Sequence, residues 1–488
     1  MGQTIPPTVP GCRATPILLY GLMVVATAAA FMAITGIGGQ LTAPANAQSA
    51  VPLMKSAGGQ ASLAQLLLAL IVLIVSCRCL GFVFRRLGQP PVIGEVIAGI
   101  LLGPTLLGRV APSALPYLLA PAAMPYLGMI AQLGIILYMF LIGLDFDIAA
   151  LRSRGHAAAA ISHASIIAPF ILGALLALAL YPVFSHDGVT FLVFALFLGM
   201  SMSVTAFPVL ARILSDRGLH KTRLGAVALA CAAMDDVTAW CLLALVIGIA
   251  QARLGAALGT LGLAGLYIAA MFLAVRPLLA RLLPTGEGRV SQRAAALVLA
   301  ALFVSAWITE CIGIHAVFGA FLLGVIIPRQ GALIREMREK LEDVVSIVLL
   351  PAFFAFAGIR TQIGLVSGAE NWLWCGAIIL VACLGKFGGS LVAARLGGMN
   401  WRDSAALGIL MNTRGLMELI VLNIGLDLGL ISPLLYTLMV IMALVTTMTT
   451  TPVLNLLGFK EVKSPQFVGI ENVVAGHSEC SAMQGQNG

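Results

Sequence analysis

Charged side chains are scarce in this sequence. Lysine, arginine, aspartate and glutamate make up 10% of the 488 residues, whereas hydrophobic residues make up 60% and the mean hydropathy is +1.03. Soluble domains carry about 25% charged residues, so this composition excludes an ordinary soluble domain. It is typical of a protein that lies within a lipid bilayer.

The sequence also lacks cysteine motifs for metals or disulfides and a glycine-rich nucleotide-binding motif after the last apolar run. The nine cysteines are scattered, several of them in the middle of apolar segments, and none has metal-ligand or disulfide-framework spacing. No glycine-rich nucleotide fingerprint follows Leu457. We therefore expect the cysteines to be small apolar fillers, and we expect no resident metal, no cofactor and no enzymatic activity.

Long apolar runs are abundant. A helix needs roughly 20 apolar residues to cross the hydrocarbon layer, and the sequence predicts about thirteen such transmembrane helices. They are expected at 63–84, 91–107, 127–145, 157–182, 190–214, 224–250, 256–280, 294–311, 315–328, 344–359, 372–394, 404–426 and 433–457. The predicted fold class is an all-α polytopic membrane protein.

The basic residues indicate the orientation. A net charge of +8 could suggest nucleic acid in a soluble protein, but here the placement of the charges follows the positive-inside rule. With Leu63 outside, most basic residues fall in the predicted inner loops. Those in the outer loops are Lys55, Arg109, Arg253 and Arg360. We expect a multi-pass protein of a bacterial-type inner cell membrane, with a cytoplasmic C-terminus and no nucleic-acid partner.

Three regions are predicted along the chain. Residues 1–61 contain an apolar run from Thr15 to Ile37, which is either a signal peptide with its cleavage site at Ala47 or an uncleaved extra helix. Residues 62–457 form the membrane domain, and residues 458–488 form a short polar cytoplasmic tail.

Two halves of the membrane domain, residues 90–250 and 314–457, resemble each other. PPVIGEVIAGILLGP at 90–104 has the same short, Gly/Pro-rich character as IHAVFGAFLLGVIIP at 314–328, and FLIGLD at 140–145 matches FAGIRT at 356–361. The predicted topology runs the two short segments in opposite directions. Such inverted repeats are typical of secondary transporters with a site near the membrane midplane.

The fourth unit of each half is interrupted. The first interruption contains Ser201, Ser203, Thr205 and Pro208, and the second contains Asn412, Thr413, Arg414 and Gly415. Pro208 lacks a backbone N–H and disfavours helix at Phe207. A proline kink and a polar packing patch would explain each alone, but matched positions predict two crossed broken helices whose ends face an ion.

Asp235 and Asp236 lie in the middle of the apolar span 224–250. Adjacent carboxylates inside a membrane are costly unless they face a partner or water, so they indicate a functional site. Neighbours on a helix point about 100° apart, so the two can serve different partners beside one aqueous cavity. Desolvation and mutual repulsion favour a proton on one of them, so that proton and cation compete for one carboxylate.

Two further groups of charges lie within predicted spans. Lys386 lies in the middle of 372–394 and needs a counter-charge, which a structural salt bridge or an exchange role at the Asp pair would equally provide. Arg414 and Glu418 are four residues apart, so we expect a pair that supports the broken helix.

The remaining charges lie near predicted helix ends. For Glu95 and Glu310 an interfacial role, a funnel role and no role all stay open. His315 opens a short helix and is either a pH sensor or a capping or packing residue. Membrane boundaries are expected at Asp145, Asp147 and Arg360.

At these residues the sequence resembles the second monovalent cation:proton antiporter family, and within it the CHX-type cation/proton exchangers. The matching phrases are QPPVIGEVIAGILLGPTLLG, LGIILYMFLIGLDFD, TAFPVLARIL, MDDVTAW, IGIHAVFGAFLLGVIIP, FFAFAGIRT, GKFGG and MNTRGLMELIVLNIGLDLG. The resemblance implies the sodium/proton antiporter fold and a homodimer, in which a six-helix core moves as an elevator beside a dimerisation domain. The large cytosolic domain that some members carry is not expected after Leu457.

The resemblance also implies roles for single residues. Asp236 corresponds to the ion-binding aspartate, Asp235 to the neighbour that pairs with Lys386, and Thr205 falls in the broken helix. Members with two acidic residues and this lysine resemble electrogenic exchangers, so the resemblance favours electrogenic exchange here.

The predicted function is exchange of K⁺ or Na⁺ for protons, with Asp236 as the shared site. A sodium-coupled solute carrier of the same fold is an alternative, although a lysine opposing two aspartates argues for cations. An intramembrane aspartyl protease would need its aspartates on different helices. A passive cation channel would not need the broken, inverted architecture.

Overall fold

The computed structural model describes residues 14–44, 63–145, 155–219, 222–250, 254–283, 292–328 and 332–459. Within these residues the secondary structure is helical throughout, and no strand is present. The first half comprises α1 (Ala14–Gly38), α2 (Leu63–Arg86), α3 (Pro91–Leu102), α4 (Leu107–Val110), α5 (Leu115–Leu118), α6 (Met124–Asp145), α8 (Gly155–Phe184), α9 (Phe191–Ser203), α10 (Phe207–Asp216) and α11 (Arg223–Ala250).

The later helices are α12 (Leu254–Ala270), α13 (Arg276–Leu282), α14 (Gln292–Ile312), α15 (Ala316–Ile326), α16 (Ala332–Val344), α17 (Leu350–Arg360), α18 (Gly368–Cys383), α19 (Gly389–Leu396), α20 (Trp401–Met411), α21 (Leu416–Asp427) and α22 (Pro433–Leu456). Three single π turns connect helices without a break in direction: Met271–Val275, Val345–Leu349 and Leu384–Gly388.

The predicted all-α membrane fold is confirmed. Twelve helices in the described part of the chain are long and apolar enough to cross a membrane, and α9 and α15 are shorter apolar helices beside them. The predicted spans fall on these helices, except that 190–214 is divided between α9 and α10, and α1 is the additional N-terminal helix. The predicted span 344–359 belongs to a longer helical run, Ile334–Leu365, because the polar α16 continues into it. The possible cleavage site at Ala47 and the tail beyond Phe459 lie outside the described residues.

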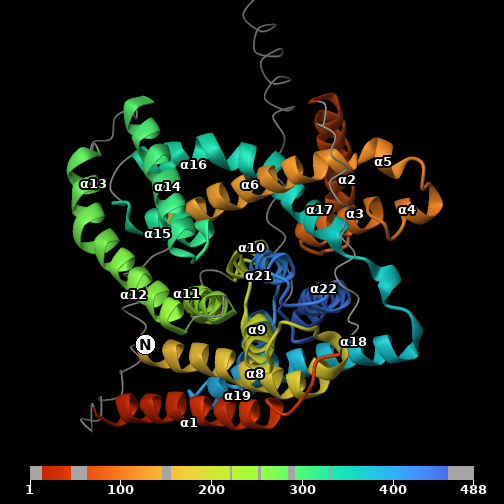
Figure 1. Cartoon of the computed structure of the whole chain (residues 1–488). Helices are drawn as coiled ribbons and strands as arrows, with labels where there is room; N and C mark the ends of the chain where they lie inside the picture. The colour runs from red at the N-terminus through yellow and green to blue at the C-terminus, as the bar shows by residue number, and fades with distance from the viewer. Residues whose placement is uncertain are drawn as a thin grey trace, which may run out of the picture.

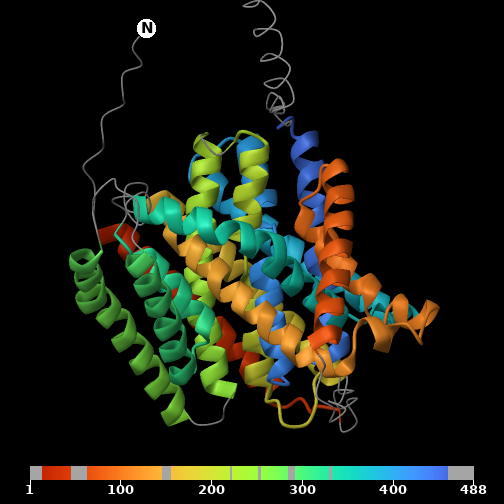
Figure 2. The ribbon, with the colours of Figure 1, turned by 90° about the horizontal axis from the view of Figure 1, so that it is seen from above.

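The helices form two layers (Figure 1). The upper layer contains α2–α6 and α14–α17, and the lower layer contains α8–α11 and α18–α22, with α12 and α13 running along one edge. Seen from above, α12–α14 lie at one side of the molecule and α2–α5 at the other (Figure 2). Helix α1 packs on the lower layer, where the ring of Phe31 lies 5.4 Å from that of Phe170 on α8.

Matched glycines hold the upper layer together. An added methyl group on Gly99 of α3 would lie 2.1 Å from the Ala355 carbonyl oxygen of α17, and one on Gly143 of α6 would lie 2.3 Å from the Phe321 carbonyl oxygen of α15. Such distances are impossible for a real side chain, so only glycine permits these backbones to touch. Each short helix therefore packs on a helix of the other half.

Candidate functional site

Helix α11 carries Asp235 and Asp236 through the middle of the lower layer. Both side chains are buried, with exposed fractions of 1% and 3%. The helix is otherwise apolar at this level, so its sequence gives the two carboxylates no partner of their own. The partners of Asp235 come from three other segments: α8, the break between α9 and α10, and the π turn between α18 and α19.

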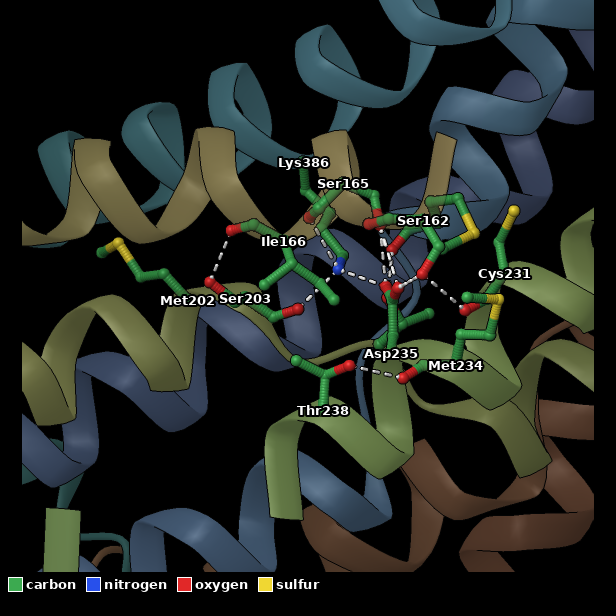
Figure 3. A network of polar contacts seen from close by, with 12 residues as sticks. Ser162, Ser165, Ile166, Met202, Ser203, Cys231, Met234, Asp235, Thr238 and Lys386 are labelled. Carbon is green, nitrogen blue, oxygen red and sulfur yellow. Dashed lines mark hydrogen bonds and ion pairs between the residues drawn. The ribbon is translucent and has the colours of Figure 1, made fainter. Parts of the chain in front are cut away.

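Asp235 is surrounded by donors (Figure 3). Its Oδ1 accepts from the hydroxyl of Ser162 at 2.8 Å, and its Oδ2 accepts from the hydroxyl of Ser165 at 2.9 Å. The hydroxyl of Thr205 and the Nζ of Lys386 also donate to Oδ2, each at 2.8 Å. This carboxylate is therefore fully solvated by the protein in its charged form.

Lys386 completes this group from the π turn Leu384–Gly388. Besides Asp235, its ammonium donates to the carbonyl oxygens of Ser165, at 3.0 Å, and Ser203. The lysine is fully buried and has three acceptors for its three hydrogens. Single π turns inside α-helices are frequent at functional sites, and this one carries Lys386 between α18 and α19.

Asp236 differs sharply from its neighbour. Its buried Oδ1 has no hydrogen-bond partner among the described residues. An unpaired oxygen of a buried carboxyl group is costly and calls for a ligand, a water or a proton. The sequence predicts different roles for the two residues, and their contacts differ: Asp235 accepts several hydrogen bonds, whereas Asp236 Oδ1 accepts none among the described residues.

The two helix breaks meet beside this pair. The backbone N–H of Ala206 in the first break donates to the Thr413 carbonyl oxygen in the second at 2.9 Å, and the Thr205 hydroxyl reaches the Met411 carbonyl oxygen at 3.2 Å. The first break lies slightly earlier than expected. Phe207 was predicted to leave the helix, but it begins α10, because Pro208 occupies the first turn, where no N–H is required.

A second buried ion pair supports the breaks. Arg414 donates to Glu418 at 2.7 Å, as their spacing predicted, and both side chains are fully buried. The guanidinium also donates to the carbonyl oxygens of Ser201 at 3.1 Å and Met202 at 2.7 Å, while the Ser201 hydroxyl donates to Glu418 at 2.7 Å. Arg414 thus satisfies carbonyls that the end of α9 leaves without helical partners.

The other charged residues lie away from the Asp pair. Glu310 accepts from the Ala316 N–H at 2.8 Å, and His315 is the N-terminal capping residue of α15, accepting from Val317 N–H. Arg360 ends α17 and forms an ion pair with Asp427 of α21.

Three further positions complete the account of the sequence-based candidates. Glu95 lies on α3 and Asp145 is the last residue of α6. Asp147 lies outside the described residues.

Sequence reasoning missed Ser162 and Ser165. Their signal was a pair of hydroxyls three residues apart, within the otherwise apolar span 157–182. Asn412 and Thr413 were predicted from the sequence only as parts of the second break. In the structure, Asn412 Oδ1 and Thr413 Oγ1 are buried without a hydrogen-bond partner among the described residues. Both are neutral oxygen donors of the kind that alkali cations bind.

Comparison with known proteins identifies the family. The family described as "Sodium/hydrogen exchanger, transmembrane" matches residues 66–456, which is most of the chain. The chain belongs to the sodium/hydrogen exchanger family. This is a family of membrane exchangers rather than enzymes, and the match includes both helix breaks and the Asp pair.

Relatives within the family agree with the predicted resemblance. The chain is 42% identical to Na(+)/H(+) antiporter NhaS4 of Synechocystis over 393 residues, covering 79% of this chain and 96% of the relative. It is 37% identical to Cation/H(+) antiporter 19 of Arabidopsis thaliana and 36% identical to K(+)/H(+) antiporter 1 of Saccharomyces cerevisiae, covering 87% and 80% of this chain. The chain spans 54% and 46% of the length of these two relatives.

A solved structure shares the fold. The sodium proton antiporter MjNhaP1 from Methanocaldococcus jannaschii, determined at pH 8, covers 82% of this chain and is itself covered completely. The TM-score is 0.50 and the sequence identity is 14%. The likeness extends to the helical architecture, and it supports the assignment of the fold alone.

Proposed function

We propose that this protein exchanges a monovalent cation, K⁺ or Na⁺, for protons, and that cation and proton compete for Asp236. The observation that carries the proposal is the contrast within the Asp pair. Asp235 has four side-chain donors, whereas the buried Oδ1 of Asp236 has none among the described residues. A proton or a partly dehydrated cation would each satisfy that oxygen, and neither can do so while the other is bound.

The helix breaks supply the rest of a cation site. Helices α9 and α20 end at the breaks, so their carbonyl ends carry partial negative charge toward the site. Thr413 and Asn412 add neutral side-chain oxygens at the second break. Neutral oxygens around one carboxylate suit an alkali cation better than a divalent one, which usually needs more anionic ligands.

Both Na⁺ and K⁺ are included because the relatives differ. The Synechocystis relative is named a Na(+)/H(+) antiporter and the yeast relative a K(+)/H(+) antiporter. Selectivity between Na⁺ and K⁺ depends on the number of coordinating oxygens and on their distances from the ion. The distances that suit the two ions differ by only tenths of an ångström. The choice therefore needs a transport measurement.

Alternating access is proposed to occur by an elevator movement of the lower layer against the upper layer. A cleft between them is lined by Val92, Val96 and Ile93 of α3 on one side, and by residues of α21 and α22 on the other. The α22 residues are Val440, Ala443, Leu444 and Thr447. The lining of this cleft is apolar apart from Arg414 and Thr447. Hydrogen bonds from Tyr436 to the Ala357 carbonyl oxygen and from Arg360 to Asn423 also join the two layers, so an elevator movement must break them.

The proposed assembly is a homodimer in a cell membrane, joined through the upper layer, with the C-terminus in the cytoplasm. The mass of the solubilised protein, corrected for detergent, tests the dimer. Accessibility of a tag after residue 488 to a membrane-impermeant protease tests the orientation. A monomer, or a tag cleaved from outside intact cells, would contradict these two proposals.

The decisive experiment measures proton flux in proteoliposomes. Purified protein is reconstituted with a pH-sensitive dye, and Na⁺, K⁺ or Li⁺ is added under a clamped membrane potential. We expect dequenching for the wild type and none for Asp236→Asn, with Asp343→Asn as a control because Asp343 is exposed on α16. Cation flux without proton counterflow would indicate a channel, and flux that requires an organic solute would indicate a symporter.

A further inference from the structure

Helix α8 contributes two hydroxyl groups that the proposed exchange does not by itself require. Ser162 and Ser165 are fully buried and lie three residues apart, so both face α11 from one side of α8. The Ser162 hydroxyl lies 2.8 Å from Asp235 Oδ1, and its other acceptor is the Cys231 carbonyl oxygen at 3.5 Å. The Ser165 hydroxyl lies 3.1 Å from Oδ1 and 2.9 Å from Oδ2 of Asp235, and its other acceptor is the Ser162 carbonyl oxygen at 2.7 Å. We call these two residues the serine pair.

The serine pair matters because Lys386 is the only cation that contacts Asp235 in the described structure. If Lys386 were the sole donor, any movement of its ammonium would leave a bare carboxylate in an apolar interior, and that carboxylate would take up a proton. With the serine pair and Thr205 in place, Asp235 keeps donors on both oxygens after Lys386 moves. Hydrogen bonds to a charged acceptor are about twice as strong as neutral ones, so this support is substantial.

Ser165 also links the two members of the ion pair. Its hydroxyl donates to Asp235, while its backbone carbonyl accepts from Lys386 at 3.0 Å (Figure 3). The carboxylate and the ammonium are therefore held from the same residue of α8. Glycine packing keeps this residue in place, since an added methyl group on Gly385 would lie 2.6 Å from the Pro169 Cα of α8.

We propose that Ser162 and Ser165 are positioning residues that keep Asp235 permanently ionised, so that the exchanged proton resides on Asp236 and is not shared with Asp235. This inference rests on the proposed function. It extends it by assigning Asp235 a fixed charge throughout the cycle. The charges on Asp235 and Lys386 then stay the same throughout each turnover, unless Lys386 itself releases a proton.

The surroundings of Asp235 contain other groups that could respond to pH. These are Asp236 and Cys231 on α11, His163 on α8 between the two serines, Lys386 on the π turn, and Arg414 and Glu418 at the second break. A test must therefore observe Asp235 itself. An infrared difference spectrum between a protein and its Asp235→Asn variant isolates the carboxyl group of Asp235, whatever the other groups do.

The spectroscopic experiment uses the full chain in the Asp236→Asn background. With the serine pair intact, we expect the difference spectrum to show only the carboxylate bands of Asp235 between pH 6 and 8. In Ser162→Ala/Ser165→Ala we expect a protonated carboxyl band to grow in as the pH falls through this range. A spectrum that stays purely carboxylate in the double variant would overturn the proposal, as would a protonated band with the serine pair intact.

The transport experiment uses the same substitutions with Asp236 present. We measure the exchange rate as a function of pH. The decline of this rate on the acidic side should move by about one pH unit toward higher pH, which is a tenfold change in proton affinity. Ser305→Ala is the matched control, because Ser305 is a buried serine of α14 whose hydroxyl donates to the Gly319 carbonyl oxygen at 2.7 Å. Ser305→Ala removes a comparable hydrogen bond far from Asp235, so the dependence of the exchange rate on pH should not change. An unchanged pH dependence in the double variant would count against the serine pair.

If the double variant fails to fold, Ser162→Ala alone is used, because Ser165 still contacts both oxygens and Lys386. We expect a smaller displacement in the same direction, and none would contradict the proposal. The proposed function and this inference fail separately. Exchange by Asp236→Asn would overturn the function, whereas the infrared result on Asp235 does not depend on transport.

Discussion

Two buried ion pairs lie beside the crossed helix breaks, and they are built differently. Arg414 and Glu418 are four residues apart across one break, and their other partners are groups at the end of α9. Lys386 and Asp235 are 151 residues apart, and their partners come from α8 and from the first break. The first pair holds one local element together. The second joins several elements and stands next to an unsatisfied carboxyl group.

This difference suggests different consequences for movement. Moving Arg414 would expose three acceptors at once, so the pair with Glu418 behaves as a fixed part of the site. Moving Lys386 exposes Asp235 only partly, because hydroxyl groups remain on both oxygens. The Lys386–Asp235 pair is therefore the one that can rearrange during a transport cycle.

The largest effect on stability is expected for Arg414→Met. It leaves Glu418 buried and uncompensated and removes donors from the Ser201 and Met202 carbonyls, and breaking a buried pair costs about 3–5 kcal/mol. The melting temperature in detergent should fall strongly. Arg414→Met/Glu418→Leu removes both charges and should regain part of the loss. A single variant that melts like the wild type would show that this pair is not the fixed one.

Lys386→Gln should change transport more than stability. The amide can still donate to a neighbouring acceptor, and Asp235 keeps three hydroxyl donors, so the loss of unfolding free energy should be about 1–3 kcal/mol, less than for Arg414→Met. The voltage dependence or the cation affinity of exchange should change clearly. Reconstituted exchange at several clamped potentials, together with melting curves, measures both. If exchange and stability were both unaffected, Lys386 would not be the rearranging partner.

Thr205→Val tests the hydroxyl group that contacts both Asp235 and the Met411 carbonyl oxygen at the second break. Valine has the same shape but cannot donate to Asp235 or to the Met411 carbonyl oxygen. One lost hydrogen bond to a charged group is worth about 1.5–3 kcal/mol, part of which Ser165 can replace. We expect a several-fold weaker apparent cation affinity with little change in melting. Thr449→Val on the exposed side of α22 is the control, and equal effects of the two would argue against a role for Thr205.

The smallest effect is expected for an exposed pair. Arg360 of α17 and Asp427 of α21 connect the upper and lower layers, and Asp427 is 60% exposed. Exposed pairs contribute about 0–1 kcal/mol and are weakened by salt. Asp427→Asn leaves the bond from Arg360 to Asn423 in place, so it should alter the stability by no more than this, with the difference vanishing at high ionic strength. A large effect that persists in salt would mean that the contact between the layers is stronger than an ordinary surface pair.

Much of the fold was predictable because its signals are local. Apolar length identifies the spans, Pro208 and the Asn412–Gly415 segment identify the breaks, and a spacing of four identifies Arg414 with Glu418. Asp235 and Asp236 were recognisable because carboxylates inside a membrane are expensive. In each case the physical cost or benefit is visible within one stretch of sequence.

The rest depended on contacts between distant segments. A serine in a membrane helix is common and usually bonds within its own helix, so Ser162 and Ser165 carried no mark of their role. Their distance from Asp235, 73 and 70 residues in sequence, is bridged only by the packing of α8 on α11.

The glycine contacts of the upper layer bear on how the protein is made. Because α3 touches α17 and α6 touches α15, the first half cannot cover Gly99 or Gly143 by itself. During synthesis α3 therefore waits for more than half of the chain before its partner enters the bilayer. In that interval lipid or the insertion machinery must cover the backbone of α3 at Gly99. A chain truncated before α17 should therefore be a substrate for membrane quality control.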